Sequence, residues 1–253
     1  MPSRPRRLFK WIVVALLVAI VLTALPVVLL RVFHPETSAF MLRGRLEARD
    51  AHDARYRTRY EWVDYRRIAP AAALAVMASE DQQFPFHHGF DMKSIRAAEV
   101  TNEEGGRVRG ASTISQQVAK NLFLWPGKSY LRKALEAWFT VLIEALWSKE
   151  RILETYLNIA QFGPGIYGVE AAAQEFFHVP AARLTPSEAA VLAAVLPNPD
   201  RLHADRPSRY VAERRDWILG QMRTLEDEDY LNLVARGGPP PPQQPEPPRH
   251  SRR

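Results

Sequence analysis

An uninterrupted apolar run stands out near the N-terminus. Residues 11–30 read WIVVALLVAIVLTALPVVLL and contain no charged side chain. At a rise of about 1.5 Å per residue, a helix of this length spans about 30 Å, the hydrocarbon thickness of a bilayer. We therefore expect a transmembrane anchor at 11–30 after a short segment at 1–10. A cleaved signal peptide is the alternative, although its apolar region is normally shorter and ends in a small-residue cleavage site.

Helical spacing dominates the region that follows. Residues 71–80 are alanine-rich, and Ser129 precedes apolar residues at helical spacing that run through Lys149. A second apolar stripe covers 148–158. Before the helix expected at 187–196, Thr185 is followed three residues later by Glu188, which is a capping-box pattern. No strand-like alternation and no glycine-rich turn after a strand interrupts this pattern, so Rossmann and P-loop sites are unsupported.

The last segment has a different composition. Residues 239–248 contain seven prolines in ten positions, which cannot form a helix or a central strand. We predict a disordered, proline-rich tail at 237–253 and a mainly α-helical domain at 31–236.

Composition excludes several kinds of chemistry. The 253 residues include no cysteine, which rules out disulfide scaffolds, cysteine-ligated metals and thiol nucleophiles. The net charge of +6 suggests binding to nucleic acid or to an anionic membrane. However, residues 1–30 contribute +4 and residues 249–253 contribute +3, which leaves 31–248 at −1. The excess charge thus lies at the two ends, and we expect no nucleic-acid partner.

The basic residues beside the apolar run give a weak orientation signal. Four precede it and four follow it within twenty residues, so the count is equal: Arg4, Arg6, Arg7 and Lys10 before, and Arg31, Arg43, Arg45 and Arg49 after. The preceding cluster is denser. We therefore expect the N-terminus in the cytoplasm and the body on the other side of the membrane.

Two segments carry chemistry-bearing side chains in dense patterns. Residues 80–91, EDQQFPFHHGFD, place two carboxylates at the end of an apolar helix, a setting that suits a general base. Residues 110–121, GASTISQQVAKN, follow a candidate helix cap at Ser112 with amide and ammonium donors that suit sugars and phosphates. The alternatives are a helix end with a structured loop for the first segment, and a polar helix face for the second.

Two further segments are less specific. Lys128, Arg132 and Glu136 recur at i, i+4 and i+8 and so share one helix face, which is also the pattern of an exposed row of salt bridges. Residues 163–172, GPGIYGVEAA, contain three glycines before an alanine-rich helix. We interpret these glycines as structural, at places where backbones approach closely.

Together these segments resemble the family 51 glycosyltransferases, the peptidoglycan polymerases. EDQQFPFHHGFD is similar to that family's E-D-x-x-F-x-x-H-x-G-x-D motif, and GASTISQQVAKN is similar to its G-x-S-T-I-[TS]-Q-Q-x-x-K-N motif. RKALE at 132–136 and SKERILETYLN at 148–158 resemble the third motif. The glycine segment and LTPSEAAVLAAVLPNP at 184–199 resemble the fourth and fifth. The matches come in order and cover most of the body.

The resemblance implies a fold and an enzyme type. The fold is mainly α, a lysozyme-like glycosyltransferase domain with one N-terminal transmembrane helix. Bifunctional relatives continue into a transpeptidase domain, whereas this chain has no K-T-G motif after its last match, so we expect the monofunctional biosynthetic transglycosylase type. Such an enzyme joins lipid II units to a nascent glycan strand by β-1,4 bonds with inversion, and releases undecaprenyl pyrophosphate.

The resemblance also implies roles for individual residues. Glu80 is the general base, and Glu136 matches the second acidic position, where it would orient the cations, hold a divalent ion or assist the leaving group. The cationic positions for the departing pyrophosphate are Lys120, Arg132 and Lys133, together with Lys128, which stands where arginine is usual and therefore lacks the bidentate fork. The remaining expected substrate-binding residues are Ser112, Gln116, Gln117, Asn121, Phe84, His87 and Asp91. The sequence requires no cofactor. A divalent cation, Mg²⁺ or Mn²⁺, is the candidate ion that Glu136 would hold.

The expected substrate also places the protein at a membrane. A polyprenyl-linked substrate stays in the bilayer, so we expect a single-pass protein of the bacterial inner membrane with its catalytic domain on the periplasmic side. Residues 122–125, LFLW, suit either the headgroup region or a buried turn. Residues 99–109 are a candidate flap over the site. Cell-wall synthesis or division proteins are candidate partners. A lysozyme-like glycan hydrolase and a non-catalytic membrane scaffold are the rival interpretations.

Overall fold

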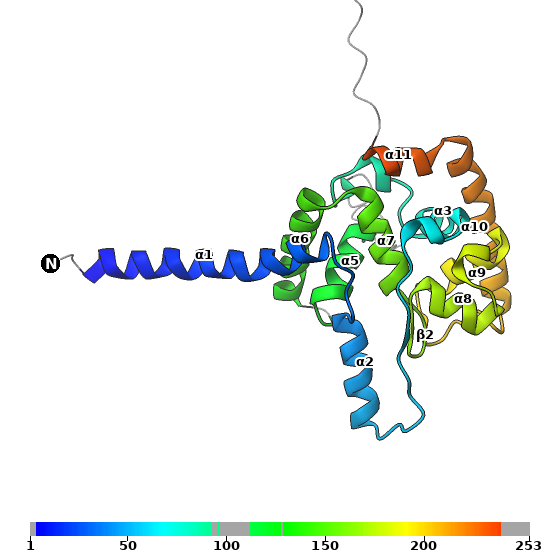
Figure 1. Cartoon of the computed structure of the whole chain (residues 1–253), viewed down its shortest axis with the longest axis horizontal. Helices are drawn as coiled ribbons and strands as arrows, with labels where there is room; N and C mark the ends of the chain where they lie inside the picture. Colours follow the sequence, from blue (N-terminus) through cyan, green and yellow to red (C-terminus); the bar gives the residue numbers. More distant parts are fainter. Residues whose placement is uncertain (1–3, 93–95, 97–111, 128, 239–253) are drawn as a thin grey trace, which may run out of the picture.

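A computed structural model describes residues 4–92, 96, 112–127 and 129–238. Its first element, helix α1 (Arg4–Leu30), projects from the body as a single long rod (Figure 1). Residues 8–30 of this helix are long and apolar enough to cross a membrane, and only 6% of their most apolar window is buried against the protein. The predicted apolar helix is therefore confirmed, and its exposed apolar surface is consistent with membrane anchoring.

The end of α1 is attached to the body by specific hydrogen bonds. Trp138 Nε1 donates to Thr23 Oγ1 at 3.1 Å, and Trp147 Nε1 donates to the carbonyl of Val27 at 2.8 Å. The Arg151 guanidinium donates to the carbonyl of Leu30 at 2.8 Å. The Arg151 bond pairs a backbone carbonyl at the helix C-terminus, and the three bonds together fix the direction in which the anchor leaves the domain.

The body is helical, as the sequence predicts. Its α-helices among the described residues are α2 (Ala39–Asp50), α3 (Pro70–Glu80), α5 (Ile114–Phe123), α6 (Tyr130–Leu146), α7 (Lys149–Ile159), α8 (Val169–Phe177), α9 (Pro186–Val195), α10 (Arg209–Asp227) and α11 (Tyr230–Arg236). Three short 3₁₀ turns are η1 (Tyr65–Arg67), η2 (Phe84–Phe86) and η3 (Ala181–Arg183). The mainly α class is thus confirmed.

A small sheet, which the sequence does not predict, joins distant segments. Strands β1 (Arg59–Tyr60), β2 (Gln161–Gly163) and β3 (Ile166–Tyr167) lie in the order β1-β3-β2, with β1 parallel and β2 antiparallel to β3. Strands of two or three residues are too short to show an alternating pattern.

Helix caps explain most element boundaries. Ser129 and Thr185 cap α6 and α9 as predicted, and Thr185 forms the full capping box with Glu188. Ser148, predicted only as the start of an apolar stripe, caps α7. Helix α6 ends at Leu146 rather than Lys149, because Ser148 starts a new helix there. The expectation that Ser112 caps the next helix is wrong: Thr113 caps α5.

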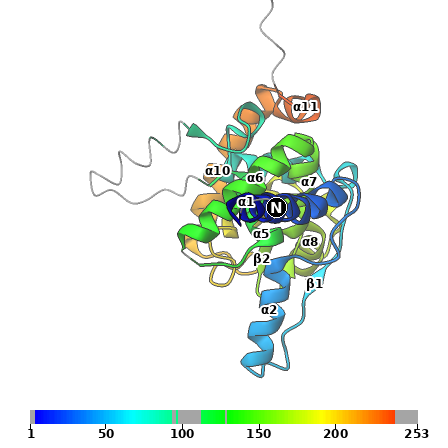
Figure 2. The same ribbon diagram turned by 90° about the vertical axis from the view of Figure 1, so that its left-hand side faces the viewer.

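Packing around α3 places the functional residues. Residues 72–78 of α3 and 189–195 of α9 are all buried, and their many alanines allow close packing of the helices. Helix α3 packs against α7, α9 and α10, while α5 packs against α6 and α7. Figures 1 and 2 show α6 beside the end of α1 and α10 on the far side of the body. The C-terminal end of α3 therefore lies between α7 and α10.

Candidate active site

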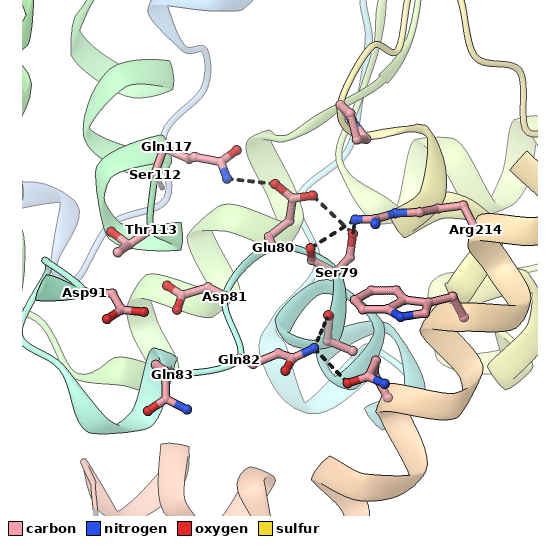
Figure 3. Close-up of a pocket in the computed structure, with 14 residues that line it drawn as sticks. Ser79, Glu80, Asp81, Gln82, Gln83, Asp91, Ser112, Thr113, Gln117 and Arg214 are labelled. Carbon is pink, nitrogen blue, oxygen red and sulfur yellow. Dashed lines mark hydrogen bonds between the residues drawn. The ribbon is translucent and has the colours of Figure 1, made fainter. Parts of the chain in front are cut away.

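A cavity of about 620 Å³ opens at the C-terminal end of α3. It contains side chains from the end of α3, the start of α5 and the inner face of α10 (Figure 3). Four of the predicted site residues line it: Glu80, Asp91, Ser112 and Gln117. The first two motifs, 30 residues apart in the chain, thus meet in one cavity.

The Glu80 carboxylate is held at both oxygens. Glu80 is the last residue of α3, and its Oε1 accepts from the Ser79 hydroxyl at 3.1 Å. Its Oε2 accepts from Gln117 Nε2 at 2.9 Å, and the Tyr156 hydroxyl donates to Oε1 of Gln117 at 3.1 Å. Burial, followed by Glu80 and Asp81, raises the pKa of Tyr156 well above its ordinary value, so this phenol remains a donor. The network fixes a carboxylate at the edge of the cavity, as a general base requires.

Asp81, which lines the cavity, pairs with His87, which does not. His87 Nε2 donates to Asp81 Oδ2 at 3.0 Å, while the backbone N–H of Gly89 donates to His87 Nδ1 at 3.1 Å. Because Nδ1 accepts a hydrogen bond, Nε2 carries the proton in this arrangement. Asp81 Oδ2 also accepts from the N–H of Ile114 at 3.0 Å, at the start of α5. The pair ties the first motif to the second.

Other motif residues lie away from the cavity surface. Phe84 is completely buried, and Lys149 Nζ lies 4.6 Å from the centre of its ring. Gln116 is part of the α5 capping box with Thr113. The structure does not place Phe84, His87 or Gln116 in the cavity lining, although each holds a lining segment in place. Lys128 and the candidate flap at 99–109 lie outside the described residues.

The predicted cations gather around Glu136. Arg132 Nη1 and Lys133 Nζ each lie 2.5 Å from a different carboxylate oxygen of Glu136, whose side chain is only 3% exposed. Lys120 lies three residues after Gln117 on α5, hence on the same helix face. Burial lowers the pKa of Lys120, opposed mainly by the Glu136 carboxylate and more weakly by Glu80. Lys120 therefore experiences the fields of both acidic residues.

This cation cluster lies beside the cavity and not in its lining. Lys120, Arg132, Lys133 and Glu136 do not line the cavity, whereas Gln117, on the same face of α5, does. Asn121, at the next turn, has a buried Oδ1 with no hydrogen-bond partner in the described part of the chain. Gln117, which contacts the proposed base, and Lys120, which interacts with the charge of Glu136, thus share one face of α5.

A divalent metal ion at Glu136 would compete with cations that are already bound there. Both oxygens of Glu136 are already paired with cationic side chains, which would have to be displaced by a metal. Within the described ranges, no group of three or more histidine, aspartate or glutamate side chains could hold an ion.

The sequence analysis missed one wall of the cavity. Arg214, Trp217 and Gln221 line it from α10, a helix outside all five motifs. Tyr156 was noticed only as part of an apolar stripe. The signal for α10 was weak, because arginine, tryptophan and glutamine on a charged surface helix look like ordinary solvent-exposed residues.

The LFLW segment is part buried and part exposed. Leu122 and Leu124 are buried in the core, whereas Trp125 is 48% exposed.

Comparison with known proteins agrees with this arrangement. The family model described as Transglycosylase matches residues 48–223, from α2 into α10. The chain belongs to the transglycosylase family. This confirms the predicted family and enzyme class, and the match contains the cavity, the cation cluster and all five motifs.

Curated transglycosylases are similar along almost the whole chain. A protein of Xanthomonas euvesicatoria pv. vesicatoria (strain 85-10) is 53% identical over 93% of this chain and 95% of its own length. One of Klebsiella oxytoca is 51% identical over 90% and 95%, and one of Cronobacter sakazakii (strain ATCC BAA-894) is 54% identical over 77% and 80%. Each is named "Biosynthetic peptidoglycan transglycosylase".

Proposed function

We propose that this protein is a peptidoglycan glycosyltransferase that polymerises lipid II into β-1,4-linked glycan strands during bacterial cell-wall synthesis. The observation that carries the proposal is the pairing of two chemical centres along α5. Gln117 donates a hydrogen bond to the Glu80 carboxylate. One turn later on α5, Lys120 interacts with the charges of the cluster formed by Arg132, Lys133 and Glu136. A base beside a cluster of cations suits a transfer from a pyrophosphate donor.

The reaction follows from these two centres. Glu80 takes the proton from the 4-hydroxyl of the acceptor sugar, and that oxygen attacks the anomeric carbon of the donor. The bond between this carbon and the pyrophosphate oxygen breaks, and the pyrophosphate leaves with the electron pair. Attack and departure occur on opposite faces of the sugar, so the α-linked donor yields a β-linked product. Glu80 then returns its proton to solvent.

The cations stabilise the charge that develops on the leaving group. Lys120 and Arg132 are largely removed from water, where a positive charge interacts more strongly with a pyrophosphate than it does in bulk solvent. Glu136 holds Arg132 and Lys133 in place, because it pairs with both before any substrate binds. We assign Glu136 this organising role.

The anchor supports a location at the inner membrane. We propose that α1 spans the cytoplasmic membrane once, with its N-terminus in the cytoplasm and the catalytic domain on the periplasmic side. The contacts of α1 with Trp138, Trp147 and Arg151 then hold the cavity at a fixed orientation to the bilayer that contains the lipid-linked substrate. Other cell-wall synthesis proteins are the expected partners.

Purified full-length protein in detergent tests the proposal directly. Incubated with lipid II and without a nucleotide, it should produce glycan polymer and release undecaprenyl pyrophosphate. Release of muropeptides from preformed sacculi, with no polymer from lipid II, would favour a lysozyme-like hydrolase. Absence of both activities in folded protein would favour a non-catalytic scaffold.

A further inference from the structure

Arg214 reaches from α10 to the residue that precedes the proposed base. Its Nη2 donates to the carbonyl oxygen of Ser79 at 3.3 Å and to the Ser79 hydroxyl oxygen at 3.4 Å. The Ser79 hydroxyl in turn lies 3.1 Å from Glu80 Oε1. Figure 3 shows the guanidinium extended across the cavity wall toward Ser79 and Glu80. A chain of contacts therefore runs from α10 to the carboxylate.

The guanidinium is fixed in place without a carboxylate partner of its own. It lies 4.8 Å from the centre of the Trp217 ring, one helical turn along α10. Its Nε is buried and has no hydrogen-bond partner, and no salt bridge of Arg214 is found among the described residues. A buried guanidinium with an unpaired N–H lowers stability unless its charge interacts favourably with a neighbouring group.

The position of Glu80 explains what that charge does. Glu80 ends α3, where the helix carbonyls create a negative potential that disfavours a carboxylate. A cation bound to the Ser79 carbonyl offsets this potential. Arg214 also acts on the Ser79 hydroxyl, whose single proton has two acceptors in reach: Glu80 Oε1, and the carbonyl of Ala193 at 3.3 Å. The charged carboxylate is the closer and stronger acceptor.

We propose that Arg214 is a positioning residue for Glu80. It acts through Ser79 to hold one carboxylate oxygen, while Gln117 and Tyr156 hold the other. The inference rests on the proposed role of Glu80 as the base. It extends the catalytic machinery to a helix that contains none of the family motifs.

The test compares kcat and KM for lipid II in full-length variants. Arg214→Gln should lower kcat about 10- to 100-fold and leave KM within about threefold of the wild type, because a displaced base slows the reaction without weakening binding. Arg214→Lys, which keeps the charge, should have an intermediate kcat. Arg209→Gln, which changes an exposed arginine five residues earlier on the same helix, is the matched control and should retain the wild-type kcat.

A double-mutant cycle tests whether the effect passes through Ser79. Since Arg214 acts on Ser79, the loss of kcat in Ser79→Ala/Arg214→Gln should be smaller than the product of the two single losses. Thermal melting should show that the variants are folded; if Arg214→Gln is not, Arg214→Lys and Ser79→Ala decide the question.

Three outcomes would overturn the proposal. The first is a kcat in folded Arg214 variants equal to that of Arg209→Gln. The second is a rise in KM at unchanged kcat. The third is a loss of kcat in the double variant equal to the product of the losses in the two single variants. A fully active Glu80→Gln would instead refute the proposed base itself, whereas an inactive Glu80→Gln beside normal Arg214 variants would refute this inference alone.

Discussion

The side-chain amide of Gln117 donates to Glu80 Oε2 at 2.9 Å and thereby connects the end of α3 to the face of α5 that also bears Lys120. Tyr156 fixes which way the amide points, because its hydroxyl donates to Oε1 of Gln117 and leaves Nε2 directed at the carboxylate. Among the bonds that join the first and second motifs, this one links a conformationally fixed donor to the proposed base.

Removing this donor should slow catalysis. In Gln117→Ala, Glu80 loses a hydrogen bond to its charged form, worth about 1.5–3 kcal/mol, so we expect kcat to fall about 10- to 100-fold. Steady-state kinetics with lipid II measure this change. Gln174→Ala, whose amide is on the exposed side of α8, should behave as the wild type, and an equally active Gln117→Ala would show that this bond is dispensable.

The buried ammonium of Lys120 should limit activity at alkaline pH. Burial lowers its pKa below the ordinary value of 10.5, so as the pH rises this side chain loses its proton, and its hold on pyrophosphate, earlier than a free lysine would. The arginine in Lys120→Arg remains charged to about pH 12. In the normalised profile of kcat/KM against pH, the alkaline limb should therefore shift to higher pH. An alkaline limb that does not move would mean that another group controls it.

Glu136 should be important for stability as well as for activity. In Glu136→Gln, the largely buried Arg132 loses its counter-charge, which should lower the free energy of unfolding by about 3 kcal/mol and Tm by roughly 10 °C. Thermal melting measures both. The matched control is Glu213→Gln, which removes the same Arg-to-Glu i,i+4 pair from an exposed site and should change Tm by only about 1 °C. Equal shifts in the two variants would contradict the organising role of Glu136.

Gly168 should not tolerate a side chain. Its φ is +85°, and an added Cβ would lie 2.5 Å from the carbonyl oxygen of Asn158. Gly168→Ala should therefore destabilise the domain by about 1–3 kcal/mol in denaturant unfolding. Gly220→Ala, in the middle of α10 with no atom near the added methyl group, should be neutral or stabilising. A neutral Gly168→Ala would contradict the close approach.

Helices with local signals could be predicted from the sequence, and contacts between distant segments could not. Ser129, Ser148 and Thr185 mark helix starts because a cap acts on the residues that directly follow it. Ser112 and Thr113 both have capping side chains, and only the geometry shows which of them bonds to Gln116. The glycines at 163–168 were correctly interpreted as structural, since Gly165 and Gly168 both have positive φ and close backbone neighbours.

The site shows the same division. Glu80, Gln117 and Lys120 could be proposed because their motifs resemble those of a known family. The inward-facing side of α10 could not, because whether Arg214 faces solvent or Ser79 depends on the packing of α10 against α3. The pairing of His87 with Asp81 was equally hidden, since a histidine in a motif resembles a ligand-binding residue until its partners are known.

The most direct test of the central claim is the rate of lipid II polymerisation by Glu80→Gln. This variant keeps the size of the side chain and one carbonyl oxygen but replaces the basic carboxylate with a neutral amide. We predict a folded protein, with the melting temperature of the exposed control Glu226→Gln, that forms polymer at less than about one-hundredth of the wild-type rate. Polymer formation at the wild-type rate by Glu80→Gln would contradict the assignment of Glu80 as the base.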